Sequence, residues 1–172
     1  MHHVPAYILL FVILSLVQIF LLNNLVVGTF LCPLIYIAFI ILLRLDTMPI
    51  VLLGCSLAMG VLMDMTMGVA GINTIATLLV GFLRPTLIRL VSPREEFRDD
   101  GVPSPERMGV SLFWSYIVVM ILLHHTVFFT LEALSWGHFM RTVLRILLSS
   151  GATLLLVWLT ERLFTAKISA RA

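Results

Sequence analysis

The sequence predicts an all-α integral membrane protein whose single domain, residues 1–172, is a bundle of six transmembrane helices. Three observations predict this fold class. Hydrophobic residues make up 60% of the chain and charged residues only 12%, whereas a soluble domain carries about 25% charged residues. The mean hydropathy is +1.11. The apolar residues are spread over nearly the whole chain, in runs that short polar segments separate.

The first, fifth and sixth helices are the clearest, because a transmembrane helix needs about 20 apolar residues. Residues 6–22, 110–131 and 139–164 form apolar runs that reach or approach this length. No Lys or Arg precedes the first run, and no A-x-A-like cleavage site follows it. We therefore interpret the first run as a retained helix and not as a signal peptide.

The middle of the chain is less regular, since its apolar runs at 32–43, 50–63 and 72–83 are shorter. Runs of this length can also be re-entrant or half-buried helices. We expect full helices, because residues that tolerate the interface can extend each run; Arg84 and Arg89, for example, can reach the lipid headgroups. The six expected helices lie at about residues 5–25, 31–44, 49–66, 70–91, 109–134 and 138–165, with a cytoplasmic loop at 92–108.

Basic residues near the ends of the helices predict the orientation, because Lys and Arg favour the cytoplasmic side. With both termini in the cytoplasm, Arg141 and Arg145 fall near the outer face. The other nine of the eleven basic residues then fall at the inner face or in inner loops. This orientation does not change if residues 31–66 form a re-entrant hairpin instead of two full helices.

The longest polar segment, residues 92–107, contains three Pro, one Gly and charges of both signs. This composition predicts a loop. The loop is either a solvated connector or a docking segment for a cytoplasmic partner.

An aspartate ends the third apolar run, in the stretch GVLMDMTMGVAGIN at residues 60–73. Asp64 falls near the outer boundary of the membrane, where the cost of a carboxylate is small. We expect its carboxylate to accept hydrogen bonds from backbone N–H groups of the following turn or helix. A ligand or proton site is the alternative. The predicted structural turn and cap consists of Gly60, Asp64, Gly68, Gly71 and Asn73.

Small residues on the third helix predict close packing. Gly54 and Ala58, and then Ser56 and Gly60, form two overlapping small-xxx-small pairs. Such pairs allow helices to approach closely in lipid. We therefore expect the third helix to lie at the centre of the bundle.

A second polar group, a predicted buried cluster or pocket, lies in the last two helices and consists of His124, His125, Glu132, Arg141 and Arg145. His125 and Glu132 are seven residues apart and share one helical face. A hairpin between the two helices brings Glu132 opposite Arg141, so we expect a buried ion pair of Glu132 with Arg141 or Arg145. Ser149 is the candidate partner of His125. A metal site is not expected, because adjacent helical residues point about 100° apart.

No enzyme signature is present in the sequence, which lacks GxSxG, HExxH and a glycine-rich phosphate loop. Two aspartates could share a proton only at close range, but Asp46 and Asp64 lie at opposite ends of the third helix. Cys32 and Cys55 lack the CxxC spacing of a metal or redox site. The net charge of +2 is too small to indicate nucleic-acid binding. We expect no catalytic residue, cofactor or metal.

Four motifs follow one another along the chain. They are LLNN after the first helix, DTMP between the second and third, G-x3-D-x3-G-x2-G-x-N at residues 60–73, and ATLLVGFLRP followed by a PRE loop. In order and spacing, over almost the whole chain, they resemble the MreD family of bacterial rod shape-determining proteins.

This resemblance implies a non-enzymatic scaffold of the cell-wall elongation machinery in the bacterial cytoplasmic (inner) membrane. Such a scaffold takes part in rod shape determination and in the regulation of peptidoglycan synthesis. The implied partners are an MreC-like single-span protein, the MreB filament, peptidoglycan synthases and membrane lipid. The implied fold is similar to the S component, the substrate-binding subunit of energy-coupling-factor vitamin transporters.

The alternative function is that the protein is itself an S component of a vitamin transporter. The first helix argues against this function, since AYILLFVILS lacks the Ala-x3-Ala pair through which S components typically dock. The helix presents Leu9, Val12, Leu16 and Ile19 at helical spacing instead. These residues favour lateral packing against other transmembrane helices.

Overall fold

The computed structural model describes residues 4–24, 30–91, 101–134 and 139–169, without the side chains of residues 91 and 164–169. Every secondary-structure element in these ranges is a helix. The elements are α1 (Val4–Leu16), the π-helical η1 (Val17–Leu22), α2 (Ile37–Leu42), α3 (Pro49–Met67), α4 (Ile72–Val91), α5 (Pro105–Met108), α6 (Val110–Ala133) and α7 (Phe139–Ser169). Residues 92–100 of the predicted loop at 92–108 are not among the residues that the structure describes.

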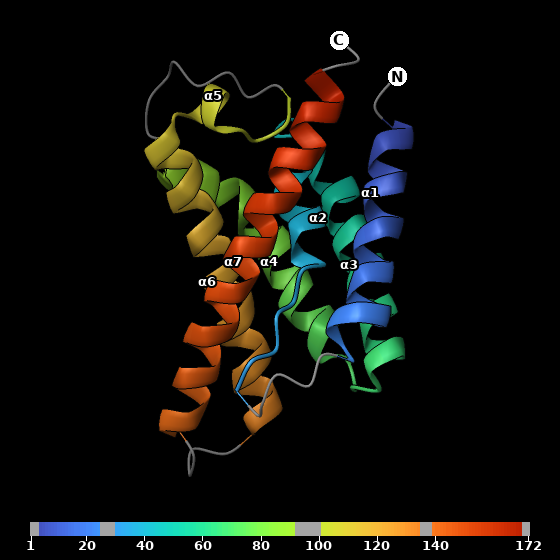
Figure 1. The fold of residues 1–172 in the computed structure, drawn as a ribbon, viewed down its shortest axis with the longest axis vertical. Helices are drawn as coiled ribbons and strands as arrows, with labels where there is room; N and C mark the ends of the chain where they lie inside the picture. Colours follow the sequence, from blue (N-terminus) through green and yellow to red (C-terminus); the bar gives the residue numbers. More distant parts are fainter. Residues whose placement is uncertain (1–3, 25–29, 92–100, 135–138, 170–172) are drawn as a thin grey trace.

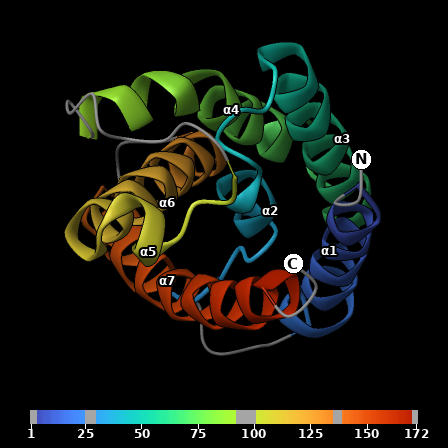
Figure 2. The same ribbon diagram turned by 90° about the horizontal axis from the view of Figure 1, so that it is seen from above.

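The long helices surround a central segment. Viewed along the bundle, α1, α3, α4, α6 and α7 form a ring with α2 in its middle (Figure 2). α1 begins and α7 ends at one end, here called the upper end, and the turn between α3 and α4 lies at the opposite, lower end (Figure 1). Residues 33–43 are all buried. The segment around α2 therefore forms the centre of the bundle, and the expectation that α3 would do so is wrong.

Four helical stretches are long and apolar enough to cross a membrane. They are Val4–Leu22, Pro49–Met67, Val110–Ala133 and Phe139–Leu163. The protein is thus all-helical, with four candidate membrane spans in the part of the chain that the structure describes. α4, which carries Arg84 and Arg89, is not one of the four, so a bundle of six spans stays a prediction.

The helix expected at residues 31–44 is wrong over its first half. Residues 31–36 are not helical, and only Ile37–Leu42 forms a helix. Pro33 accounts for the start of this stretch, because proline disfavours the helical conformation of the residue before it. The N–H groups of Leu34 and Ile35 then bind the side chains of Thr153 and Gln18 rather than helical carbonyls. We call residues 30–36 the entry segment, since they lead from the lower end into α2 at the centre (Figure 1).

α3 and α4 lie against each other at two small residues. A Cβ added to Gly60 would lie 2.5 Å from Cα of Thr74, and one added to Gly81 would lie 2.2 Å from Oγ of Ser56. Of the two predicted pairs on α3, Ser56 and Gly60 thus face α4. The other pair, Gly54 and Ala58, is exposed on the outside of the bundle, because α3 belongs to the ring and only its outer face has no neighbouring helix (Figure 2).

The sequence suggested that Arg84 reaches the lipid headgroups, and this expectation is wrong. The Arg84 side chain is buried inside the bundle and only 1% exposed. Its guanidinium donates to the backbone carbonyls of Leu43 and of Arg44, the latter at 3.2 Å. Its Nε donates to the hydroxyl of Tyr116 on α6 at 2.8 Å, and this hydroxyl donates to the carbonyl of Ile41 at 2.9 Å. The last carbonyls of a helix lack partners within the helix and carry partial negative charge. Arg84 therefore stabilises the C-terminal end of α2.

We predict that Arg84→Leu lowers the free energy of unfolding by about 2 kcal/mol or more, because it leaves buried carbonyls without donors. Arg89→Leu is the matched control, since Arg89 lies on the same helix and is exposed; it should change stability by about 0.5 kcal/mol or less. Thermal unfolding of the detergent-solubilised variants measures both effects. Equal melting temperatures for the two variants would contradict the role of Arg84.

Candidate functional site

The entry segment crosses an apolar interior, so its backbone polar groups need hydrogen-bond partners from other elements. α7 provides two of them. Oγ of Ser149 accepts from the N–H of Cys32 at 3.0 Å, and Oγ1 of Thr153 accepts from the N–H of Leu34 at 3.0 Å. Ser149 also donates to the carbonyl of Phe30 at 3.3 Å. Ser149 and Thr153 are four residues apart and so lie on one face of α7.

Gln18 on η1 also binds the entry segment. This side chain is 1% exposed. Its Oε1 accepts from the N–H of Ile35 at 2.8 Å, and its Nε2 donates to the carbonyl of Pro33 at 3.3 Å and to Oδ1 of Asn23 at 2.8 Å. Gln18 is the second residue of η1, and π-helical turns of this kind are frequent at functional sites. The entry segment is therefore held between η1 and α7.

A chain of buried polar side chains continues from α3 across the bundle. Nδ2 of Asn73 donates to Asp64 at 3.0 Å, which leaves its Oδ1 to accept from the hydroxyl of Tyr36 at 2.7 Å. Since this hydroxyl has one hydrogen, it accepts from Nε2 of His124, at 2.9 Å. Nδ1 of His124 has no hydrogen-bond partner among the described residues. The chain joins α3, α4, the entry segment and α6.

His125 faces protein, as predicted, but its partner is not Ser149. Nε2 of His125 lies 3.1 Å from Oγ1 of Thr153, and its Nδ1 lies 2.9 Å from the carbonyl of Ile121. Thr153 thus binds both His125 and the entry segment. The predicted partner was off by one helical turn, since Thr153 lies four residues after Ser149 on α7.

The Asp64 carboxylate caps the N-terminal end of α4. One oxygen accepts from the N–H of Asn73 at 2.9 Å, and the other accepts from the N–H of Thr74 at 2.9 Å and from its hydroxyl. The residue before α4 is Gly71, which has no side chain to act as a cap. Gly68 and Gly71 have positive φ values of 67° and 82°, and this left-handed conformation favours glycine. The turn thereby places the N-terminal end of α4 against the Asp64 carboxylate.

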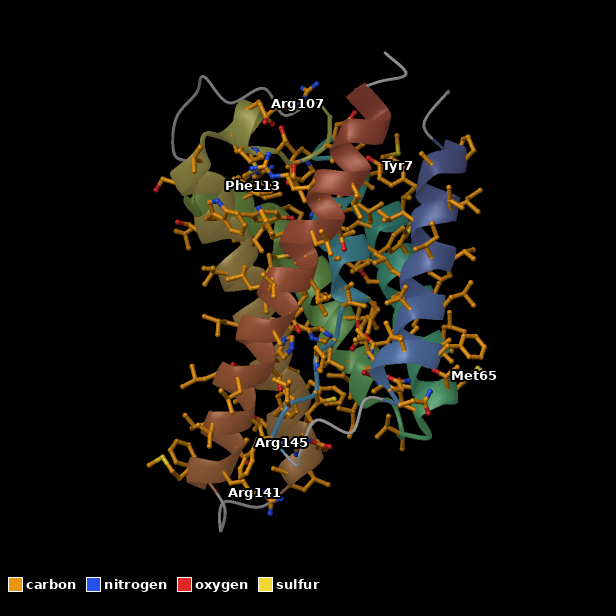
Figure 3. The ribbon with its side chains drawn as sticks, in the orientation of Figure 1. Tyr7, Met65, Arg107, Phe113, Arg141 and Arg145 are labelled. Atoms are coloured by element: carbon orange, nitrogen blue, oxygen red, sulfur yellow. The ribbon has the colours of Figure 1, made fainter. Side chains whose placement is uncertain are left out.

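Glu132 pairs with Arg145, one of its two expected partners, at 2.7 Å. The pair is not buried as expected, since the side chains of Arg145 and Glu132 are 25% and 35% exposed. The guanidinium of Arg145 lies 4.7 Å from the ring centre of Phe129, and that of Arg141 lies 5.6 Å from Phe30. Arg141 and Arg145 both lie near the lower end (Figure 3). The predicted polar cluster is therefore two groups, the histidines inside and the ion pair at the periphery.

Asp46 lies at the upper end, before α3 begins. Nε and Nη2 of Arg44 each donate to a carboxylate oxygen of Asp46 at 2.8 Å. These hydrogen bonds lower the pKa of Asp46 below its ordinary value. Asp64 lies near the other end of α3, so the two carboxylates are remote from each other.

Within the described ranges, no three His, Cys, Asp or Glu side chains come together as a metal-binding group. The rings of His124 and His125 are inclined at 70° with their centres 5.5 Å apart. Cys32 and Cys55 are free, half-buried thiols.

Sequence reasoning missed five residues that organise the interior. They are Gln18, Tyr36, Arg84, Tyr116 and Thr153. A signal existed for the polar ones, because a polar side chain inside an apolar run usually faces protein rather than lipid. Their partners could not be inferred, since those of Gln18, Arg84 and Tyr116 include backbone groups of a segment that the sequence predicts to be helical, and those of Tyr36 lie 37 and 88 residues away along the chain.

Comparisons with known proteins identify no relative. No family model, no curated protein and no solved structure matches the chain. The functional argument therefore depends on the residues and on their geometry.

We predict that Asp64→Asn lowers the free energy of unfolding by about 1.5 kcal/mol and Asp64→Leu by about 3 kcal/mol. Asparagine retains one acceptor oxygen but turns an NH2 group towards donors, whereas leucine accepts no hydrogen bond. Thermal unfolding in detergent measures the order, with the exposed Met65→Leu as the unchanged control. Equal destabilisation by both substitutions would point to a role for the charge rather than for the individual hydrogen bonds.

Proposed function

We propose that this protein is a non-enzymatic membrane scaffold of the bacterial cell-wall elongation machinery, of the MreD type. Its task is rod shape determination and regulation of peptidoglycan synthesis together with an MreC-like single-span partner. The observation that carries the proposal is the use of the interior polar groups. They bind the protein's own backbone or one another, while the lateral faces of the bundle are apolar and open.

The centre of the ring, where a solute would sit, is occupied by the protein itself, since residues 33–43 are buried there. Small-molecule sites need convergent polar groups that are available to the ligand. Gln18, Thr153 and Arg84 instead donate to or accept from the backbone of the central segment. This arrangement favours a structural role over the alternative, a vitamin-binding S component.

The outward faces of α1 and α3 support a scaffold. Leu9, Val12 and Leu16 are 43%, 44% and 48% exposed, as their spacing predicts for a lateral surface, while Ile19 is half-buried. Apolar faces of this kind associate in lipid through packing and scattered polar contacts. Further proposed partners are the MreB filament, the peptidoglycan synthases and membrane lipid.

In the proposed topology, the chain crosses the inner membrane six times and both termini are cytoplasmic. α4 and the segment of residues 30–42 provide the two passes beyond the four candidate spans. The proposed topology assigns nine of the eleven basic residues to the upper end and only Arg141 and Arg145 to the lower end. Figure 3 shows Arg107 near the upper end and Arg141 and Arg145 near the lower end. Because basic residues favour the cytoplasm, the upper end is the cytoplasmic one.

We predict that an MreC-like protein from the same genome co-purifies with the full chain, and that depletion of the chain makes rod-shaped cells round. The reason is that the bundle offers lateral surface rather than a solute site. Affinity purification from solubilised membranes and microscopy of depleted cells measure these outcomes. The purified chain, reconstituted alone, should take up no solute.

Two results would contradict this function. Saturable vitamin binding by the purified chain, with cell shape unaffected by its deletion, would favour the S component. For the orientation, a cysteine introduced at the exposed Glu106 should resist an impermeant reagent applied to intact cells, and labelling from outside would reverse the topology.

A further inference from the structure

Arg141 and Arg145, near the lower end, oppose the charge distribution of the rest of the chain (Figure 3). Basic residues favour the cytoplasmic side of a membrane, and the proposed topology places the lower end on the outer side. The two residues are four positions apart and so lie on one face of α7. They differ in the counter-charge that the protein offers to each of them.

The charge of Arg145 is matched inside the protein. Its Nη1 lies 2.7 Å from Oε2 of Glu132, and its Nη2 donates to Oε1 of Glu132 at 3.3 Å. This paired arrangement suits the planar fork of a guanidinium and a carboxylate. The pair carries no net charge, and both oxygens of the Glu132 carboxylate are engaged.

Arg141 has no carboxylate partner among the described residues. Its guanidinium lies over the ring of Phe30, 5.6 Å from the ring centre, and this contact leaves its N–H donors without an acceptor. Besides Glu132, the one described acidic residue that belongs to the lower end is Asp64, whose carboxylate caps α4. Residues 25–29 and 135–138, which lie outside the description, contain no Asp or Glu. The counter-charge of Arg141 therefore comes from outside the chain.

The position of Arg141 on α7 indicates which environment supplies this charge. Arg141 is the third residue of the candidate span Phe139–Leu163, about 3 Å along the helix at 1.5 Å per residue. Its side chain is exposed, and long basic side chains near the end of a span direct their charge towards the lipid headgroups. Towards the membrane centre, Leu144 and Leu148 follow at helical spacing and are 44% and 46% exposed. A cation beside an exposed apolar strip matches a lipid with a negatively charged headgroup.

We propose that Arg141 binds the phosphate of an anionic phospholipid whose acyl chain lies along Leu144 and Leu148. The inference rests on the proposed function, in which membrane lipid is a partner, and adds the place of contact. The proposed topology assigns this lipid to the outer leaflet. A guanidinium binds a phosphate through parallel N–H donors, as it binds a carboxylate, and the contact with Phe30 keeps these donors available.

Two other sources of phosphate fit less well. A zwitterionic phospholipid brings an ammonium group together with its phosphate, so it leaves the charge of Arg141 unmatched. A soluble phosphate supplies the charge but has no acyl chain to cover the exposed leucines.

Photo-labelling of the purified full chain in detergent micelles tests the site. The probe is a phosphatidylglycerol analogue with a photoreactive headgroup, and mass spectrometry of peptides maps its adducts. We expect adducts within residues 139–148. Arg141→Gln should lower this labelling about fivefold, as the loss of one basic residue near anionic lipid predicts. Arg141→Lys, which keeps the charge, should retain most of it.

Arg162→Gln is the matched control. Arg162 is exposed on the same helix, towards its other end, and its guanidinium also lies over an aromatic ring, 6.0 Å from the centre of Trp158. Both substitutions remove one positive charge from the chain, but Arg162→Gln should leave the labelling of residues 139–148 unchanged. Melting temperatures check that both variants fold, which is expected for exposed side chains.

Four results would overturn the proposal. Equal labelling of Arg141→Gln and the unsubstituted chain would show that Arg141 does not bind the headgroup. An equal loss with Arg162→Gln would assign the labelling to net charge. Equal labelling by a phosphatidylethanolamine analogue would remove the preference for anionic lipid. Displacement of the probe by glycerol 3-phosphate would assign the site to a soluble phosphate.

The lipid site and the proposed function can fail separately. The labelling uses neither the MreC-like partner nor an oriented membrane, so any of these four results would leave the proposed function intact. Failure of the MreC-like protein to co-purify would overturn the proposed function, whereas the labelling of residues 139–148 would stand.

Discussion

A backbone N–H or C=O that is buried in an apolar interior without a partner costs several kcal/mol, and the entry segment carries such groups into the middle of the bundle. A continuous helix would satisfy them internally. Residues 31–36 are not helical, so side chains from elsewhere must bind the exposed backbone. Non-helical backbone at membrane depth occurs only where protein or water surrounds it, and here the ring of helices surrounds it.

This constraint explains why polar side chains occur inside so apolar a chain. Gln18 on η1 and Thr153 on α7 bind the entry segment from two sides, and Arg84 on α4 binds the backbone where α2 ends. Each of these side chains ties a different helix of the ring to the same central segment. The helices are therefore positioned by one element that all of them contact, and the lipid-facing sides remain free for other proteins.

The interior network also connects the lower turn to the centre. Asp64 caps the N-terminal end of α4 and binds the side chain of Asn73. Asn73 in turn accepts a hydrogen bond from the hydroxyl of Tyr36, which also bonds His124. Buried hydrogen bonds of this kind make the packing of a core specific, although Nδ1 of His124 has no partner among the described residues.

The number of residues that separate two interacting partners in the sequence decides whether the sequence could predict their contact. Asp64 bonds residues nine and ten positions away, so the turn glycines and the short spacing were enough to predict the cap. Ser149 lies 117 residues from the N–H that it binds, and no local pattern encodes that pairing. The apolar runs predicted most helix boundaries, whereas the break before α2 depends on partners that only the folded bundle brings together.

The central claim is that side chains of η1 and α7 hydrogen-bond the entry segment, and residue-resolved amide hydrogen exchange in detergent micelles tests it most directly. The amides of Cys32, Leu34 and Ile35 should exchange as slowly as those in the middle of α3. Thr153→Val should speed exchange at Leu34 more than at Ile35, and Gln18→Leu should do the reverse. Rapid exchange of all three amides in the unsubstituted protein would contradict the account.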